Sequence, residues 1–261
     1  MVVDAPKLQK LLTAPPTPVT PRDLRRDGSV FHVGGELPPQ QTLETLFDSH
    51  CLAPAELFHL SFGAPETFSN GETLARLIKR NFNVHILGIM DYPASPTLLE
   101  RAYAAGVDIV DIPLSALGRP EREGRIASLQ SAQTIFPRWS VVTSIVLGED
   151  PLKDTLSEID HLLTQGIVPL LQLPSPTARC GIAEAADAYG HLATQWRTHK
   201  VTVAPLLPFI TLATPLVPQK QGGPLRGLMD RLRDRRLLAA SDLRRALRVR
   251  QVEESFESAG L

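Results

Sequence analysis

The sequence is poor in cysteine and contains no long hydrophobic run. Its two cysteines among 261 residues, Cys51 and Cys180, lie far apart, which predicts free thiols in a reducing cytoplasm and no disulfide framework. Two thiols cannot supply the ligands of a cysteine-bound iron–sulfur cluster or a structural zinc, so we expect neither in this chain alone. No apolar run approaches the roughly 20 residues that span a bilayer, and no secretory signal is evident at the N-terminus.

An excess of charge of one sign is missing as well. The chain has 27 Lys and Arg against 28 Asp and Glu, a net charge of −1, which gives no global attraction to nucleic acid or membrane. It contains no HExxH pattern, no Walker loop and no Ser–His–Asp elbow. His32, His59 and His85 fall inside apolar runs, where hydrogen-bonded core histidines are the favoured interpretation. Carboxylates are common ligands of divalent cations, and several stand at the ends of the predicted strands. No pair of ligands at helical spacing accompanies them, so we predict no metal site.

From Ser29 onward, short apolar runs alternate with longer segments of helical periodicity. The apolar runs show little polar alternation, which is typical of parallel strands buried on both faces. About six or seven such units favour an α/β fold of the (βα) barrel type, an incomplete TIM barrel, with an open doubly wound sheet as the alternative. The expected strands are 29–33, 57–62, 84–89, 108–112, 140–147, 168–173 and 201–207, and the expected helices are about 40–49, 71–81, 95–105, 120–136, 151–165 and 181–199.

Composition divides the chain into three segments. Residues 1–28 hold an amphipathic stretch, KLQKLL, and a proline cluster that predicts a stiff extended linker. Residues 29–218 form the predicted barrel, and residues 219–261 form an arginine-rich helical extension. Between 226 and 250 there are nine arginines and three acids, with leucines such as Leu243 and Leu247 at helical spacing. The favoured interpretation is an amphipathic helix pair packed under the barrel with its arginines in water; a docking surface for an acidic partner protein comes second and nucleic acid third.

Ligands of parallel α/β folds bind at the carboxyl ends of the strands, so the candidate site residues are those at the ends of the predicted strands. Asp91 follows the third predicted strand and Asp111 lies at the end of the fourth, and both are the candidates for acid/base chemistry. Glu66 follows the second strand, and Glu149 and Asp150 follow the fifth. The alternative for these last three acids is that they only stabilise the N-terminus of the next helix, an effect of about 0.3–1 kcal/mol.

Several strand-end stretches together resemble the radical S-adenosylmethionine (SAM) barrel, in particular its biotin synthase-like branch. FGAPE at 62–66 is similar to the Gly-Gly-Glu motif that holds the methionine amino group of SAM in that family, which implies cofactor-binding roles for Gly63 and Glu66. SIVLGED at 144–150 is similar to the stretch beside the adenine, which implies such roles for Ser144, Gly148 and Glu149. GIVPLLQLPSP resembles the sixth strand and adds Gln172, and LATPLVP at 212–218 resembles the closing segment.

One feature of that family is absent. Its three-cysteine loop follows the first strand, where this chain reads VFHVGGELPPQQTLETLF. Three thiolates hold the cluster that cleaves SAM, so radical chemistry is not expected of this chain alone.

Three hypotheses therefore remain. The first is a barrel that binds SAM or a related small molecule in its mouth without a cluster, as a non-catalytic or accessory partner of an enzyme of cofactor or sulfur metabolism. The second is a stand-alone barrel enzyme that uses strand-end carboxylates for acid/base chemistry. The third is an interaction subunit whose barrel mouth is filled by side chains.

Overall fold

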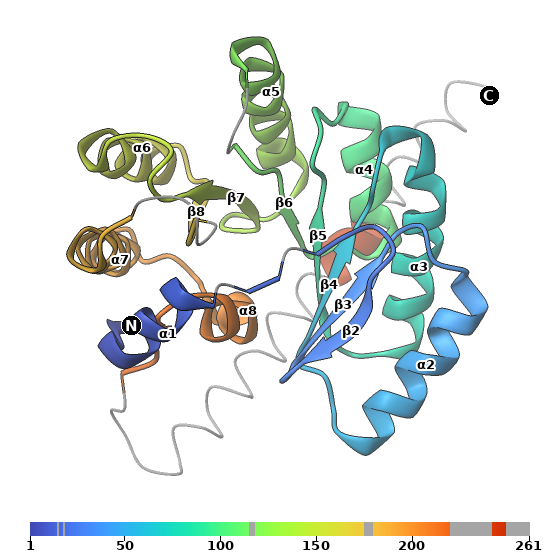
Figure 1. Cartoon of the computed structure of the whole chain (residues 1–261). Helices are drawn as coiled ribbons and strands as arrows, with labels where there is room; N and C mark the ends of the chain where they lie inside the picture. Colours follow the sequence, from blue (N-terminus) through green and yellow to red (C-terminus); the bar gives the residue numbers. More distant parts are fainter. Residues whose placement is uncertain (15, 18, 115–117, 175–179, 220–241, 249–261) are drawn as a thin grey trace.

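The computed structural model describes residues 1–14, 16–17, 19–114, 118–174, 180–219 and 242–248. Its centre is a curved sheet of seven strands in sequential order, which confirms the α/β class (Figure 1). The first two strands are antiparallel and every later pair is parallel. The sheet is not closed, since β2 and β8 form its two edges. The strands are β2 Leu24–Asp27, β3 Val30–Gly34, β4 Leu57–Ser61, β5 His85–Ile89, β6 Ile109–Asp111, β7 Val141–Val146 and β8 Val168–Gln172.

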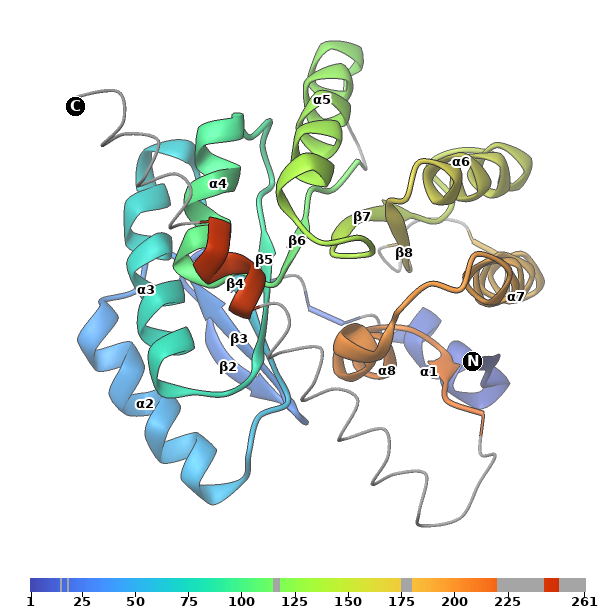
Figure 2. The same ribbon diagram turned by 180° about the vertical axis from the view of Figure 1, so that it is seen from behind.

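The helices that follow the parallel strands lie on the outer side of this sheet (Figures 1 and 2). Each overlaps a helix expected from the sequence. Helix α4 shows why: the Ser95 side chain caps its start, Pro96 occupies its first turn, and Gly106 ends it in a left-handed conformation with φ 117°. The helices are α2 Pro39–Leu52, α3 Phe68–Asn81, α4 Pro96–Ala105, α5 Arg119–Ile135, α6 Leu152–Thr164 and α7 Ile182–Thr198.

The prediction of a seventh barrel strand at 201–207 is wrong. Ala204–Leu206 form a 3₁₀ turn, and Leu207–Ala213 form helix α8. Pro205 and Pro208 stand in the first turn of these elements, where proline is tolerated because its missing N–H would have no partner. Helix α8 lies on the concave side of the sheet, and its Phe209 ring contacts His59 on β4 with 5.1 Å between the ring centroids.

The N-terminal segment is more ordered than a linker. The KLQKLL stretch lies in helix α1, Ala5–Thr13, whose first turn is capped by Asp4. Strand β1, Val2–Val3, pairs with strand β9, Leu216–Val217, so the start of the chain is joined to residues that follow α8. The predicted linker also contains β2, because residues 24–27 pair with β3 as a hairpin.

The core consists of two apolar clusters. The first lies between β3–β6 and helices α2–α5 and includes Phe31, Phe58 and Phe62. The second joins β7 and β8 to α1, α6, α7 and α8, with Leu8 and Tyr189 fully buried. Among the described residues, none of the helices combines the length and the hydropathy that crossing a membrane would need.

Residues 242–248 form a helix beside α4 (Figure 2). They are the described part of the predicted docking surface 226–250, the rest of which lies outside the described residues. Arg245 is 7% exposed, and it donates to the Tyr103 carbonyl oxygen at 2.7 Å and to the Asp108 carboxylate at 2.7 Å. Leu243 and Leu247 are 63% and 54% exposed. For this turn, the expected helix is present, but the expectation of buried leucines is wrong. The expectation of arginines in water holds for Arg244 and is wrong for Arg245.

Candidate functional site

The carboxyl ends of the parallel strands meet at one edge of the sheet. Gly34, Ser61, Ile89 and Asp111 stand in register across β3, β4, β5 and β6. The stretches selected from the sequence as ligand-binding therefore follow neighbouring strands along this edge. We call it the carboxyl edge.

Two of the predicted site residues, Asp111 and Ser144, are in direct contact. The Asp111 carboxylate accepts a hydrogen bond from the Ser144 hydroxyl at 2.7 Å and another from the Ser144 backbone N–H at 3.1 Å. Both residues are almost fully buried, with 1% exposure each. Burial raises the pKa of Asp111 to about 6, against the opposing effect of the bonds from Ser144. This carboxyl group can hold or release a proton near neutral pH, which is the property of a general acid or base.

Asp91, the other predicted acid/base candidate, is held in an ion pair. Its carboxylate lies 2.5 Å from the guanidinium of Arg125 on α5, whose side chain is only 4% exposed. Arg125 also donates to the backbone carbonyls of Asp91 and Pro113, both at 2.9 Å, and to the Glu121 carboxylate at 2.7 Å. Arg125 thus ties together the segments that follow β5 and β6. An Asp occupied in this way is a weaker candidate for proton transfer than Asp111.

Arg125 was missed by the sequence analysis. Its signal was its position: it shares a buried helix face with Ser128, Leu129 and Ala132, at spacings of three, four and seven residues. An arginine on the apolar face of a helix needs a buried partner, and here the partners are backbone and carboxylate oxygens at the carboxyl edge.

Gly63 and Glu66 lie beyond the end of β4. Gly63 has φ 70°, a left-handed conformation that favours glycine, and an added Cβ would come within 2.8 Å of the Thr67 hydroxyl. Glu66 is exposed and borders a hollow of about 540 Å³. The hollow is lined by Arg22, Glu36, Glu66, Thr67, Ser69 and Asn70.

The surroundings of Glu66 are polar and acidic. Arg22 and Glu36, two of the lining residues, form an ion pair at 2.9 Å, and no side chain of the described residues forms an ion pair with Glu66. Burial and the nearby charge of Glu66 raise the pKa of Tyr92 to about 12. The Tyr92 hydroxyl is buried without a hydrogen-bond partner in the described part of the chain. Tyr92 does not line the hollow, so the oxygens that a ligand with donor groups would meet there are those of the Glu66 carboxylate.

Gly148, Glu149 and Gln172 lie further along the carboxyl edge. Gly148 and Glu149 are exposed in the connection from β7 to α6, and Gly148 has φ 83°. The Gln172 carbonyl accepts from the Leu147 N–H at 2.9 Å, which ties the ends of β7 and β8 together. In the sheet, β5 and β6 separate the strand before Glu66 from the strand before Glu149, and none of these three residues lines the hollow at Glu66. The structure therefore brings Asp111 and Ser144 together but leaves Glu66 and Glu149 apart.

The residues after β3 do not fit an iron–sulfur cluster. The connection from β3 to α2 contains no cysteine, and Gly34 at the end of β3 and Gly35 directly after it are packed against backbone. An added Cβ on Gly34 would lie 2.2 Å from the Pro21 carbonyl oxygen, and one on Gly35 would lie 2.4 Å from that of Ser61. Both cysteines have free thiols: Cys51 near the end of α2 and Cys180 between β8 and α7.

The buried histidines are part of the core, which confirms their interpretation. His32, His59 and His85 are between 2% and 4% exposed. His32 and His59 face each other with 3.1 Å between their Nδ1 atoms, and burial lowers the pKa of His59 to about 3. Within the described ranges, no group of three or more His, Cys, Asp and Glu side chains is arranged to hold a metal ion.

Comparisons with known proteins give no family for this chain. No protein-family model matches the sequence, and no curated protein matches it. The resemblance to the radical SAM barrel therefore rests on the quoted motifs alone.

Proposed function

We propose that this chain is a partial (βα) barrel that binds SAM or a related adenosyl compound at its carboxyl edge, without radical chemistry. In this role it is a non-catalytic or accessory partner of an enzyme of cofactor or sulfur metabolism. The observation that carries the proposal is the order of the quoted motifs. FGAPE follows the second parallel strand, SIVLGED begins within the fifth and continues past its end, and GIVPLLQ runs along the sixth, which is the order that the resemblance requires.

The chemistry around Glu66 supports the ligand. The ammonium of a methionine moiety is a strong donor, and Glu66 offers a solvent-accessible carboxylate without an ion-pair partner among the described residues. Gly63 holds a conformation that turns the chain beyond β4, which supports close approach of a ligand to the backbone. The absence of three thiolates from the first connection removes the cluster and with it reductive cleavage of the cofactor.

Calorimetric titration tests this proposal. SAM and S-adenosylhomocysteine are expected to bind saturably, and adenosine more weakly, because it lacks the ammonium. Glu66→Gln should weaken SAM binding by about 10- to 100-fold, the effect of one hydrogen bond to a charged group. The matched control is Glu56→Gln, an exposed glutamate directly before β4 at the opposite edge of the sheet. Equal loss in both variants, or no SAM binding at all, would contradict the proposal.

The second candidate is an acid/base enzyme, and Asp111 is the observation that favours it. A carboxyl group with a pKa of about 6, fixed by Ser144, is suited to transfer a proton at neutral pH. The near-complete burial of Asp111 weighs against this candidate, because a substrate needs access to the carboxyl group. We therefore rank it below the binding role.

The role of the arginine segment as a docking surface for a partner protein stays a prediction. Arg245 and Arg248, the two arginines of the described turn that contact the rest of the chain, bind Asp108 and Glu100. A partner would therefore have to use arginines outside this pair.

A further inference from the structure

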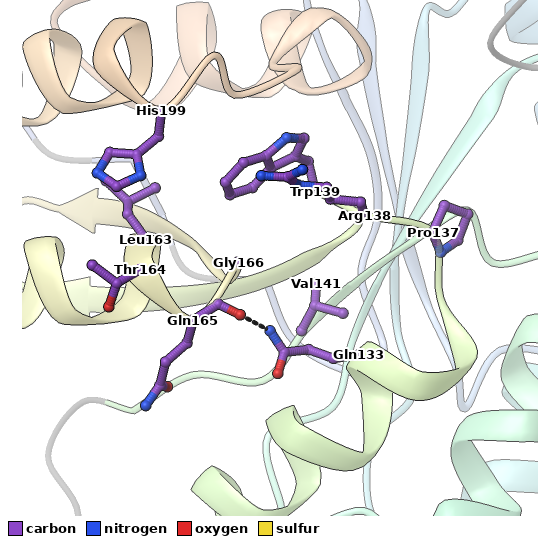
Figure 3. A pocket seen from close by; sticks show the side chains of 10 residues that line it. All are labelled: Gln133, Pro137, Arg138, Trp139, Val141, Leu163, Thr164, Gln165, Gly166 and His199. Atoms are coloured by element: carbon purple, nitrogen blue, oxygen red, sulfur yellow. Dashed lines mark hydrogen bonds between the residues drawn. The ribbon is translucent and has the colours of Figure 1, made fainter.

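A second pocket lies at the opposite edge of the sheet, where β7 and β8 begin. Its volume is about 580 Å³, within the usual range of roughly 300–1,000 Å³ for small-molecule sites. It is bounded by the last turns of α5 and α6, by the residues that precede the two strands, and by the residue after α7 (Figure 3). Its lining residues are Gln133, Pro137, Arg138, Trp139, Val141, Leu163, Thr164, Gln165, Gly166 and His199. We call it the amino-edge pocket.

One part of its wall is apolar. Val141 belongs to β7 and Leu163 to α6. Trp139, which is 9% exposed, adds its indole ring. Trp139 has φ 68°, a left-handed conformation that a bulky side chain rarely adopts. The chain thus holds this tryptophan in an unusual turn at the wall of the pocket.

The cationic part of the wall comes from Arg138. Its guanidinium lies 4.7 Å from the centre of the Trp139 ring. Stacking uses the flat face of the guanidinium and leaves its N–H groups, which lie in the plane, free to donate. Within the described residues no carboxylate or carbonyl oxygen accepts from Arg138, so its donors are available to a ligand.

The remaining polar groups lie around the same space. His199 and Leu163 lie across the pocket from Arg138 and Trp139 (Figure 3). The Gln133 side-chain amide donates to the Gln165 carbonyl, which joins the ends of α5 and α6 and fixes that side of the wall. None of the ten lining residues is an acid. The pocket therefore combines an apolar wall with a positive charge that nothing in its lining neutralises.

We propose that the amino-edge pocket binds a small aromatic carboxylate. The carboxylate accepts from the free N–H edge of Arg138, with His199 as a second donor, because a guanidinium matches a carboxylate in two parallel hydrogen bonds. The ring packs on Pro137 and on the exposed part of Trp139, above Val141 and Leu163, which are 2% and 1% exposed. Apolar area of the ring and of these residues then leaves water. This site is separate from the carboxyl edge and does not depend on the function proposed there.

Benzoate is the probe, because two of its analogues separate the two contributions. Benzamide keeps the ring without the charge, and acetate keeps the carboxylate without the ring. Tryptophan fluorescence and calorimetry of the full chain report binding, since Trp139 lies in the wall and the other tryptophan, Trp196, is 3% exposed. We expect saturable benzoate binding, with both analogues at least about tenfold weaker.

Arg138→Gln should weaken benzoate binding by about tenfold or more while leaving SAM binding unchanged. The matched control is Arg119→Gln, an arginine at the start of α5 whose side chain is 91% exposed, and it should leave benzoate binding as it is. No saturable benzoate binding below about 10 mM, benzamide binding as tightly as benzoate, or an Arg138→Gln variant with unchanged affinity would each overturn the proposal.

Discussion

At the scale of single residues, Asp111 is the most perturbed acid of the carboxyl edge. Its folded pKa of about 6 lies above the ordinary 3.8, because burial disfavours the charged form. The folded state therefore binds more protons than the unfolded state between about pH 4 and pH 6. The stabilisation from protonated Asp111 is complete below about pH 4 and is lost as the pH rises through 6.

We predict that Asp111→Asn flattens this dependence. Asparagine keeps an oxygen for the Ser144 N–H and offers an amide N–H to the Ser144 hydroxyl, so the local bonds are retained. The wild-type protein should lose roughly 3 kcal/mol of unfolding free energy through this group between pH 4 and pH 7.5, and the variant should not. Urea unfolding at both pH values measures the difference. Parallel pH profiles for the two proteins would contradict it, as would a carboxyl carbon shift of Asp111 that titrates near pH 4.

The contact between Asp111 and Ser144 shows how far residue-level prediction reaches. Each residue was selected separately, because each stands at or near the end of an apolar run. Their contact depends on the register of β6 and β7, in which Asp111 is paired with Val142 and Ser144 lies two residues beyond. No sequence periodicity fixes that register. Arg125 was missed for a related reason, since its partners come from segments around 91 and 113, far from it along the chain.

At the scale of elements, the helix at 242–248 is held by charge more than by apolar contact. Asp108 is buried at the base of β6, with Lys79 at 3.1 Å and Arg245 at 2.7 Å. Burial alone would raise the pKa of Asp108, but a hydrogen bond with His85 and the charges of Lys79 and Arg245 outweigh it and lower the pKa. The buried carboxylate needs its counter-charges, and this explains why the helix turns Arg245 inward and leaves two leucines exposed.

Arg245→Met should therefore destabilise the protein by about 3–5 kcal/mol, the usual effect of removing one partner of a buried ion pair. Arg244→Met is the matched control, because Arg244 stands next to Arg245 but is exposed, and we expect a change of less than about 0.5 kcal/mol. Chemical unfolding of the two variants at neutral pH measures this. Similar small changes in both would mean that residues 242–248 do not stabilise the sheet.

The elements themselves were largely predictable, because six strands and six helices follow from hydrophobic periodicity, caps and glycines. The failure at 201–207 has a local cause. VTVAPLL has the composition of a strand, but Pro205 and Pro208 cannot donate to a sheet and are compatible with the start of a helical turn. The pattern of apolar residues alone could not separate the two outcomes.

At the scale of the whole molecule, the N-terminal segment is part of the folded body. Helix α1 packs against α7, and β1 pairs with β9. The first residues of the chain are therefore joined to the last part of the predicted barrel. We predict that Leu8→Ala, at a side chain with 0% exposure, lowers the unfolding free energy by about 2–5 kcal/mol. Leu52→Ala, at 90% exposure, is the control and should change it by less than about 0.5 kcal/mol. An equally small loss at Leu8 would show that α1 is a detachable arm.

The carboxyl edge is proposed to bind an adenosyl ligand without a cluster beside it. A thermal unfolding series of the full chain at increasing SAM concentration measures this binding. Ligand that binds only the folded state stabilises it by about 2.7 kcal/mol at a hundredfold excess over Kd, so the melting temperature is expected to rise steadily with SAM. A melting temperature that stays constant up to millimolar SAM, with Glu66→Gln indistinguishable from wild type, would contradict it.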